Sequence, residues 1–309
     1  MSVTNTLLTY GDASRKEDVV LNSIEYLTAE ENTAMRLLGK TKAIDTVHMY
    51  LTDTLQTASS AAVQMGANYS YDALVTPVRL SNIVEEIAKP IIVARPQEVI
   101  EHYTGQNEFD RQLTKALKNW GNSAEFDLIR STLVSGVSGT VAKMNGIING
   151  ISKSTNTSAH TSGTAFSASI LDAVMSDNWD NSNGDVATDL LVGSVMKRVI
   201  DTFTQKTNIV VNSPNSVSNI VKTVTTYETS MGTLTIHKHR YVQQSSDATG
   251  RVLGIRSEKL KVAYLDKPFI QSDLSADGPY KKRAVYGSLT LEIRNQDSNF
   301  FYSGFLKSV

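Results

Sequence analysis

The stretch Gln97–Leu133, QEVIEHYTGQNEFDRQLTKALKNWGNSAEFDLIRSTL, carries apolar side chains mostly three or four residues apart. They are Val99, Tyr103, Phe109, Leu113, Leu117, Trp120, Ala124 and Leu128. This spacing indicates an amphipathic helix, and Pro96 suits its first turn. At ~1.5 Å per residue the helix would be on the order of 55 Å long, far beyond the usual globular length. Gly105 and Gly121 should weaken or bend it. The sequence therefore predicts one dominant helix.

The clearest strand signal lies near the end of the chain, at Arg283–Asn295. There Val285, Leu289, Leu291 and Ile293 alternate with polar side chains, which is typical of a half-buried strand. Residues 295–298, NQDS, predict a turn, and residues 299–306 predict a returning partner strand. We therefore expect a C-terminal β-hairpin.

A second alternating segment, Thr46–Gln56, precedes the long helix. Val47, Met49, Leu51 and Leu55 would share one face of this strand, and His48, Tyr50, Thr52 and Thr54 the other. Shorter signals predict helices within 21–38, 169–175 and 193–204, and strands at 87–94, 209–212, 233–238, 251–255 and 261–265. Residues 1–22 resemble an arm, and the mixture predicts an α+β fold.

The composition excludes several classes of function. The chain has 309 residues, 40% of them hydrophobic, and its 30 basic and 31 acidic residues give a net charge of −1. Tight nucleic-acid binding normally needs a basic excess, so it is disfavoured. There are no cysteines, which excludes disulfides, Cys-ligated zinc and thiol catalysis. With no signal-like or membrane-length apolar run, we expect a soluble, non-secreted protein.

The stretch Ala34–Thr41, AMRLLGKT, fits a loose phosphate-binding loop pattern. A working loop needs a buried strand before it, small residues within it and a helix after it. Here a helix precedes the stretch, the residues inside it are bulky, and a strand follows. We interpret Gly39 as a helix cap whose neighbours Lys40 and Lys42 complement the helix dipole, and we expect no nucleotide chemistry.

The remaining motifs are weak. Gly136–Thr140 almost makes a nucleophile elbow but lacks its second glycine, so a flexible connection is the better interpretation. His237 and His239 could face one metal ion, yet no third ligand is evident and an exposed pair is the simpler reading. Asp177, Asp180 and Asp185 miss the spacing of a calcium loop and suit solvated turns. We therefore expect no catalytic residues, cofactor or metal.

The order of these elements resembles a tailed-bacteriophage major capsid protein of the Hong Kong ninety-seven-like fold. The local amino-acid sequence is similar to that of the SU-ten-type major head protein family over most of the chain. The similar segments are Glu31–Leu55, Ser81–Gly105, Trp120–Ile129 with Met144–Ile147, Tyr227–Val242 (YETSMGTLTIHKHRYV) and Leu274–Asn295. One departure is Asp277-Gly278, where the family usually has Gly before Asp, which puts only the turn type in doubt.

This resemblance implies an N-terminal arm at 1–38, an extended E-loop at 39–86, and a P domain with its spine helix at 87–140. An A domain would follow at 141–273, and the P-domain hairpin at 274–309. It places Gly39, Lys40 and Thr41 at the start of the E-loop. Near-zero net charge suits a shell whose lining must release DNA.

The implied function is a non-enzymatic shell protein that forms homo-hexamers and homo-pentamers around double-stranded DNA, without sequence-specific binding and without a membrane. Scaffolding, portal and decoration proteins are conceivable partners, and assembly would occur in the host cytoplasm before the protein resides in the virion. The expected contacts between subunits are Val47, Met49, Tyr50, Leu51, Leu55, Glu101 and Arg111. The rivals are an encapsulin-like compartment, a tail or head-completion protein, and a soluble enzyme.

Some capsids of this fold join subunits by an isopeptide bond from an E-loop lysine. Here no lysine occurs between Lys42 and Lys89, and cysteines are absent. We therefore expect a shell held by non-covalent contacts.

Overall fold

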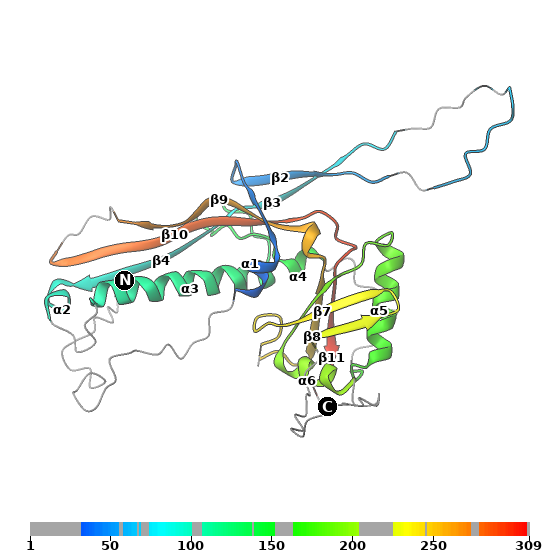
Figure 1. Ribbon diagram of the computed structural model, residues 1–309. Helices are drawn as coiled ribbons and strands as arrows, with labels where there is room; N and C mark the ends of the chain where they lie inside the picture. Colours follow the sequence, from blue (N-terminus) through cyan, green and yellow to red (C-terminus); the bar gives the residue numbers. More distant parts are fainter. Residues whose placement is uncertain are drawn as a thin grey trace, which may run out of the picture.

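The computed structural model describes residues 32–55, 58–66, 68, 74–100, 107–137, 139–151, 163–203, 225–244, 246–272 and 278–307. The predicted arm at 1–22 and the predicted strand at 209–212 lie outside these ranges. Figure 1 shows an elongated body with a long helix, a smaller body beside one end of it, and a hairpin that projects away from both.

The long helix is α3, Glu108–Arg130, and it is preceded by a separate short helix, α2, Arg95–Val99. The prediction of one helix from 97 to 133 is therefore wrong. Ile100, just after α2, has extended backbone angles, and so has Asn107, whose side chain accepts a hydrogen bond from the Phe109 N–H at 3.0 Å. Asparagine at this position satisfies a free amide and starts a new helix. Gly121 does not interrupt α3; a Cβ there would lie 3.0 Å from the Asn32 side chain.

A four-stranded sheet lies along α3 in the order β1-β9-β10-β4 (Figure 1). Its strands are β1 (Gly39–Lys42), β4 (Glu85–Ala94), β9 (Leu260–Gln271) and β10 (Tyr280–Ile293). β10 is antiparallel to both β9 and β4, while β1 is parallel to β9. The indole of Trp120 on α3 donates to the Ile87 carbonyl at 2.9 Å, which fixes the helix against the edge strand β4.

The smaller body is a five-stranded sheet in the order β11-β8-β5-β7-β6. Its strands are β5 (Asp189–Val192), β6 (Thr226–Thr229), β7 (Gly232–Lys238), β8 (Gly250–Ile255) and β11 (Phe300–Phe305). Helices α5 (Ala168–Asn181) and α6 (Ser194–Phe203) pack on it through a second apolar core that includes Leu171, Met196 and Phe300.

β11 pairs with β8 and not with β10, so the predicted C-terminal hairpin is wrong. The turn after β10 is held by buried Asn299, whose amide donates to the Asn295 carbonyl at 2.6 Å and accepts from the Arg256 N–H at 2.8 Å. The tip of the Phe300 ring lies against Gly254, where any Cβ would be 2.2 Å from it. These contacts direct the last strand into the other sheet.

The remaining elements are α1 (Thr33–Leu37), α4 (Ile147–Gly150), η5 (Ser257–Lys259) and the two-stranded antiparallel hairpin of β2 (Val47–Thr52) and β3 (Val78–Ile83). The predicted strands at 46–56, 87–94, 233–238, 251–255 and 261–265, and the helices at 169–175 and 193–204, are confirmed as β2, β4, β7, β8, β9, α5 and α6. The α+β fold is confirmed with them.

Candidate functional site

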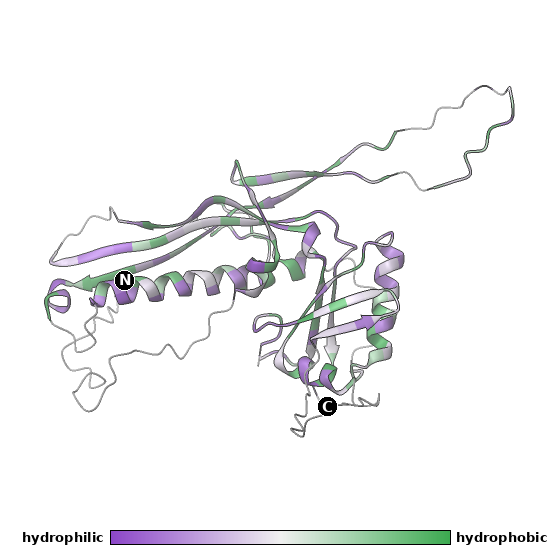
Figure 2. Cartoon of the chain, viewed as in Figure 1, coloured by the Kyte–Doolittle hydropathy of each residue, from purple (hydrophilic) through white to green (hydrophobic). Residues whose placement is uncertain are grey.

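The β2–β3 hairpin turns its apolar side chains to solvent. Val47, Met49 and Leu51 alternate on β2 and are 39%, 55% and 65% exposed, and Val78 on β3 is 59% exposed. Beyond β2, Leu55 is 98% exposed. Apolar residues recur along the projecting segment in Figure 2. An apolar face of this size, left open on a projecting element, marks an interaction surface.

The opposite face of the hairpin is polar and binds the body of the chain. His48 is buried and its Nε2 lies 2.7 Å from an oxygen of Glu292 on β10. The Tyr50 hydroxyl accepts from the Ile293 N–H at 3.1 Å, and burial raises the pKa of this phenol. The polar side chains thus anchor the hairpin and leave the apolar ones outward.

Asn82 on β3 completes this anchor. Its amide donates to the carbonyls of Leu291 at 2.8 Å and Asn145 at 3.1 Å, and its oxygen accepts from the Asn145 N–H at 2.8 Å. Thr290 donates to the Ile83 carbonyl at 2.7 Å. The base of the hairpin is therefore fixed to β10 and to the segment before α4.

Directly after β3, the buried carboxyl of Glu85 meets the α3 helix. It accepts from the Met144 N–H at 3.2 Å and the Ser131 hydroxyl at 3.4 Å. Burial and the nearby charge of Asp127 raise the pKa of Glu85 to about 7, and burial raises the pKa of Asp127 as well. Both carboxyls line a hollow of about 640 Å³ between β4 and α3.

A second buried carboxyl, Glu125 of α3, joins three parts of the chain. It accepts from the backbone N–H groups of Ala34 at 2.5 Å and Met35 at 2.9 Å, at the start of α1. The Nε2 of His239, just after β7, lies 2.8 Å from it, and both side chains are fully buried. The Tyr241 N–H donates to His239 Nδ1 at 3.2 Å, so Nε2 carries the proton and donates to Glu125.

The histidines therefore do not form the exposed pair expected from the sequence. His237 contacts Asp189 at 3.0 Å, while His239 points to Glu125. Asp185 lies within ion-pair distance of Arg256 and Lys259. Among the described residues, no group of three or more His, Cys, Asp or Glu side chains is placed to hold a metal ion. No helix in the described ranges is both long enough and apolar enough to span a membrane.

In the stretch 34–41, the helix and the strand come in the reverse order to that of a phosphate-binding loop. The helix α1 comes first and the strand β1 follows, so no helix start faces Gly39–Thr41. The expectation that Gly39 caps the helix is wrong, because the extended residue Leu38 ends α1 and Gly39 already pairs with Lys261 in the sheet. The described residues of 136–140 lie in a loop whose flanking residues Val134 and Lys143 form a bridge, and its interpretation as a flexible connection stays a prediction.

Sequence reasoning found the exposed apolar residues of the hairpin but missed its anchor. Tyr50, expected as a contact between subunits, also binds Ile293 within the chain. Arg111 forms a 2.5 Å ion pair with Glu108 one turn earlier. Glu101 lies outside the described residues. The one sequence signal for this buried polar face is the alternation of His48 and Tyr50 with apolar residues.

Comparison with known proteins agrees with this geometry. Among solved structures, the capsid of a native GTA particle has a TM-score of 0.67 at 8% identity, covering 99% of this chain and 100% of that one. The capsid of Myoviridae phage XM1 gives 0.60 at 10% identity, with 93% and 97% covered. The holo-SrpI encapsulin of Synechococcus elongatus gives 0.64 at 11% identity, with 95% and 94% covered.

These likenesses show that the chain has the Hong Kong ninety-seven-like fold expected from the sequence. No curated protein matches the chain. The family model described as SU10 major capsid protein matches residues 3–305, nearly the whole chain. With an apolar hairpin face that it cannot bury alone, this chain belongs to the SU10 family of phage major capsid proteins.

Proposed function

We propose that copies of this chain assemble into the pentamers and hexamers of an icosahedral bacteriophage head that encloses double-stranded DNA. The observation that carries the proposal is the two-faced hairpin, with its polar side anchored on β10 and its apolar side open. Anchoring makes the outward face rigid, so a neighbouring subunit meets a preformed surface and little ordering entropy is lost on binding.

The free energy available from this face is substantial. Burying one large aliphatic side chain contributes about 1.5–3 kcal/mol. Val47, Met49 and Leu51 share one face of the hairpin, whereas Val78 lies on the other face, opposite Thr52, and Leu55 lies beyond β2. We propose these as contacts between subunits, with Tyr50 and Arg111 supporting the contact surface from within the chain. Glu101 remains a predicted contact.

The strand pairings suggest a revised division of the chain. We propose that the four-stranded sheet with α3 is the P domain, that β2–β3 is the base of the E-loop, and that the five-stranded sheet is the A domain. β9 then belongs to the P domain and β11 to the A domain, unlike the predicted boundaries at 141–273 and 274–309. The arm at 1–38 remains a prediction.

The remaining features of the role follow from charge and chemistry. A net charge of −1 suits a lining that encloses DNA without gripping its sequence. We propose a protein without catalytic activity, without a cofactor and without a membrane partner, assembled in the host cytoplasm. Scaffolding, portal and decoration proteins are proposed partners of the finished head.

An encapsulin-like compartment is the second candidate, because the SrpI encapsulin shares the fold at a TM-score of 0.64. Electron microscopy of the purified chain should show closed icosahedral shells, and particles from a phage lysate should contain nuclease-protected double-stranded DNA. Packaged protein without DNA would favour the compartment. Tubes or open rings would favour a tail or head-completion role.

A further inference from the structure

Two side chains of like charge flank an exposed tryptophan at the end of α5. On α5, half-buried Asp177 precedes Trp179 by two residues and exposed Asp180 follows it by one; the Trp179 side chain is 45% exposed and rests against Gly184. We call Asp177, Trp179 and Asp180 the acidic flank. An exposed aromatic side chain beside charged residues is typical of a residue that anchors a protein–protein interface.

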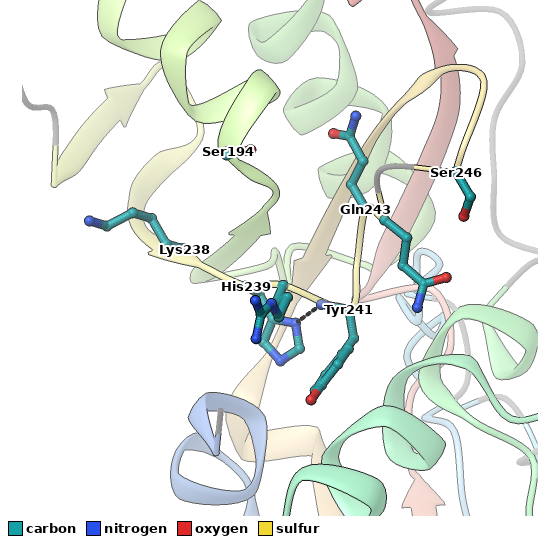
Figure 3. Close-up of a pocket in the computed structure, with 8 residues that line it drawn as sticks. Ser194, Lys238, His239, Tyr241, Gln243 and Ser246 are labelled. Carbon is teal, nitrogen blue, oxygen red and sulfur yellow. Dashed lines mark hydrogen bonds between the residues drawn. The ribbon is translucent and has the colours of Figure 1, made fainter. Parts of the chain in front are cut away.

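A basic hollow lies at the end of β7, where the chain continues past Lys238 (Figure 3). It has a volume of about 800 Å³, and its lining includes Ser194, Lys238, Arg240, Tyr241 and Ser246. Lys238 and Arg240 are exposed, whereas their neighbour His239 is buried against Glu125. The hollow therefore has a buried floor beneath exposed cationic side chains.

Across the described residues, Asp177, Asp180, Lys238 and Arg240 form no ion pair. Other acidic groups nearby are paired: Asp185 with Arg256, and Asp247 with Arg130. Unpaired charges of opposite sign on one chain suit a contact between copies.

The two surfaces face different sides of the molecule. In Figure 1, α5 lies at the edge of the smaller body away from α3, and β7 runs across that body from the edge beside α5 to its last residue, Lys238. Surfaces on opposite sides cannot meet within one chain. They can meet between successive copies in a head-to-tail contact, which closes into a ring when the rotation allows.

We propose that the acidic flank of one subunit docks into the basic hollow of the next subunit around each capsomer axis. The proposal rests on the assembly proposed above and names a second contact between neighbouring subunits, in addition to that of the hairpin. Asp177 and Asp180 would face Lys238 and Arg240, and the indole of Trp179 would stack on the Arg240 guanidinium or the Tyr241 ring.

The absence of native cysteines allows a direct test by cross-linking. Asn181→Cys and Ser246→Cys place one thiol beside each surface without altering the four charges. Assembled particles of the double variant, treated with a short bismaleimide, should give a ladder up to the pentamer and hexamer on denaturing gels. Each single variant, treated alike, should stay monomeric. Monomers alone from assembled double-variant particles would overturn the proposal.

Charge reversal separates this contact from assembly in general. Lys238→Glu with Arg240→Glu should lower the yield of shells at least about tenfold, equivalent to 1.4 kcal/mol. Adding Asp177→Lys and Asp180→Lys to the same chain should restore it. If the wild type forms shells and the reversed variant forms them equally well, the docking is refuted while the proposed function stands. If the wild type itself forms no shells, the proposed function fails first.

Discussion

At the scale of single residues, the buried carboxyl of Glu85 should make folding depend on pH. Its pKa is raised from 4.5 to about 7, so the folded chain holds this proton more tightly than the unfolded chain. Stability should therefore fall as pH rises from about 4.5 to about 7. Glu85→Gln keeps an acceptor for the Met144 N–H and removes the titration. We expect the variant to melt a few degrees higher than wild type at about pH 8 and equally near pH 4. An unchanged pH slope in calorimetry of free subunits would contradict this.

His239 donates a hydrogen bond to a buried carboxyl, so its loss should be costly. His239→Ala leaves Glu125 without its side-chain donor, which should cost about 1.5–3 kcal/mol. His237→Ala is the matched control, because that half-exposed histidine pairs with Asp189 near the surface and should cost under about 1 kcal/mol. Urea unfolding of free subunits measures both values. Equal losses would show that Glu125 is satisfied by the α1 amides alone.

At the scale of elements, the hairpin should loosen as a unit when its anchor is removed. Asn82→Ala deletes hydrogen bonds to Leu291 and Asn145 and leaves those buried backbone groups unsatisfied, at a cost of about 1–3 kcal/mol. Hydrogen exchange should accelerate in β2 and β3 but not in β8. Thr52→Ala, farther along the hairpin, is the control. Uniform acceleration across the chain would mean that Asn82 holds the whole fold.

The element scale also shows what could be predicted from the sequence. Periodicity located β2, β4 and most of α3, because these segments bury one face against a regular neighbour. It also located β10, but the expectation that this strand is half-buried is wrong, because its polar residues Ser288, Thr290 and Glu292 are buried as well. It missed the break at Ile100–Asn107, since the capping asparagine competes with an apolar spacing that continues across it. It also paired β11 with β10, because sequence proximity favours a hairpin while the contact of Phe300 with Gly254 is non-local.

The candidate site could also be predicted from the sequence only in part. The exposed apolar residues of the hairpin could be predicted from alternation alone. The anchor could not be predicted, because His48 meets Glu292 across 244 positions of sequence. The acidic flank and the basic hollow were likewise seen only as turn residues and a histidine pair.

At the scale of the whole molecule, the shell should be held without covalent bonds. No lysine lies between Lys42 and Lys89 to donate an amine from the projecting segment, and no cysteine is present. Several interfaces of about 1,600 Å² per subunit can provide stable association. Particles boiled in SDS should give one band near 33.8 kDa. A ladder of multimers would reveal a bond from an amine elsewhere in the chain.

We propose that the outward face of the hairpin holds the subunits together. Met49→Glu with Leu51→Glu places charges on that face, where the side chains are 55% and 65% exposed in the single chain. Exposed substitutions should change subunit stability by less than about 0.5 kcal/mol. Analytical ultracentrifugation under assembly conditions is the decisive measurement. We predict that wild type sediments as shells and that the variant, with unchanged melting, sediments as free subunits. Shells formed by the variant as readily as by wild type would contradict the account.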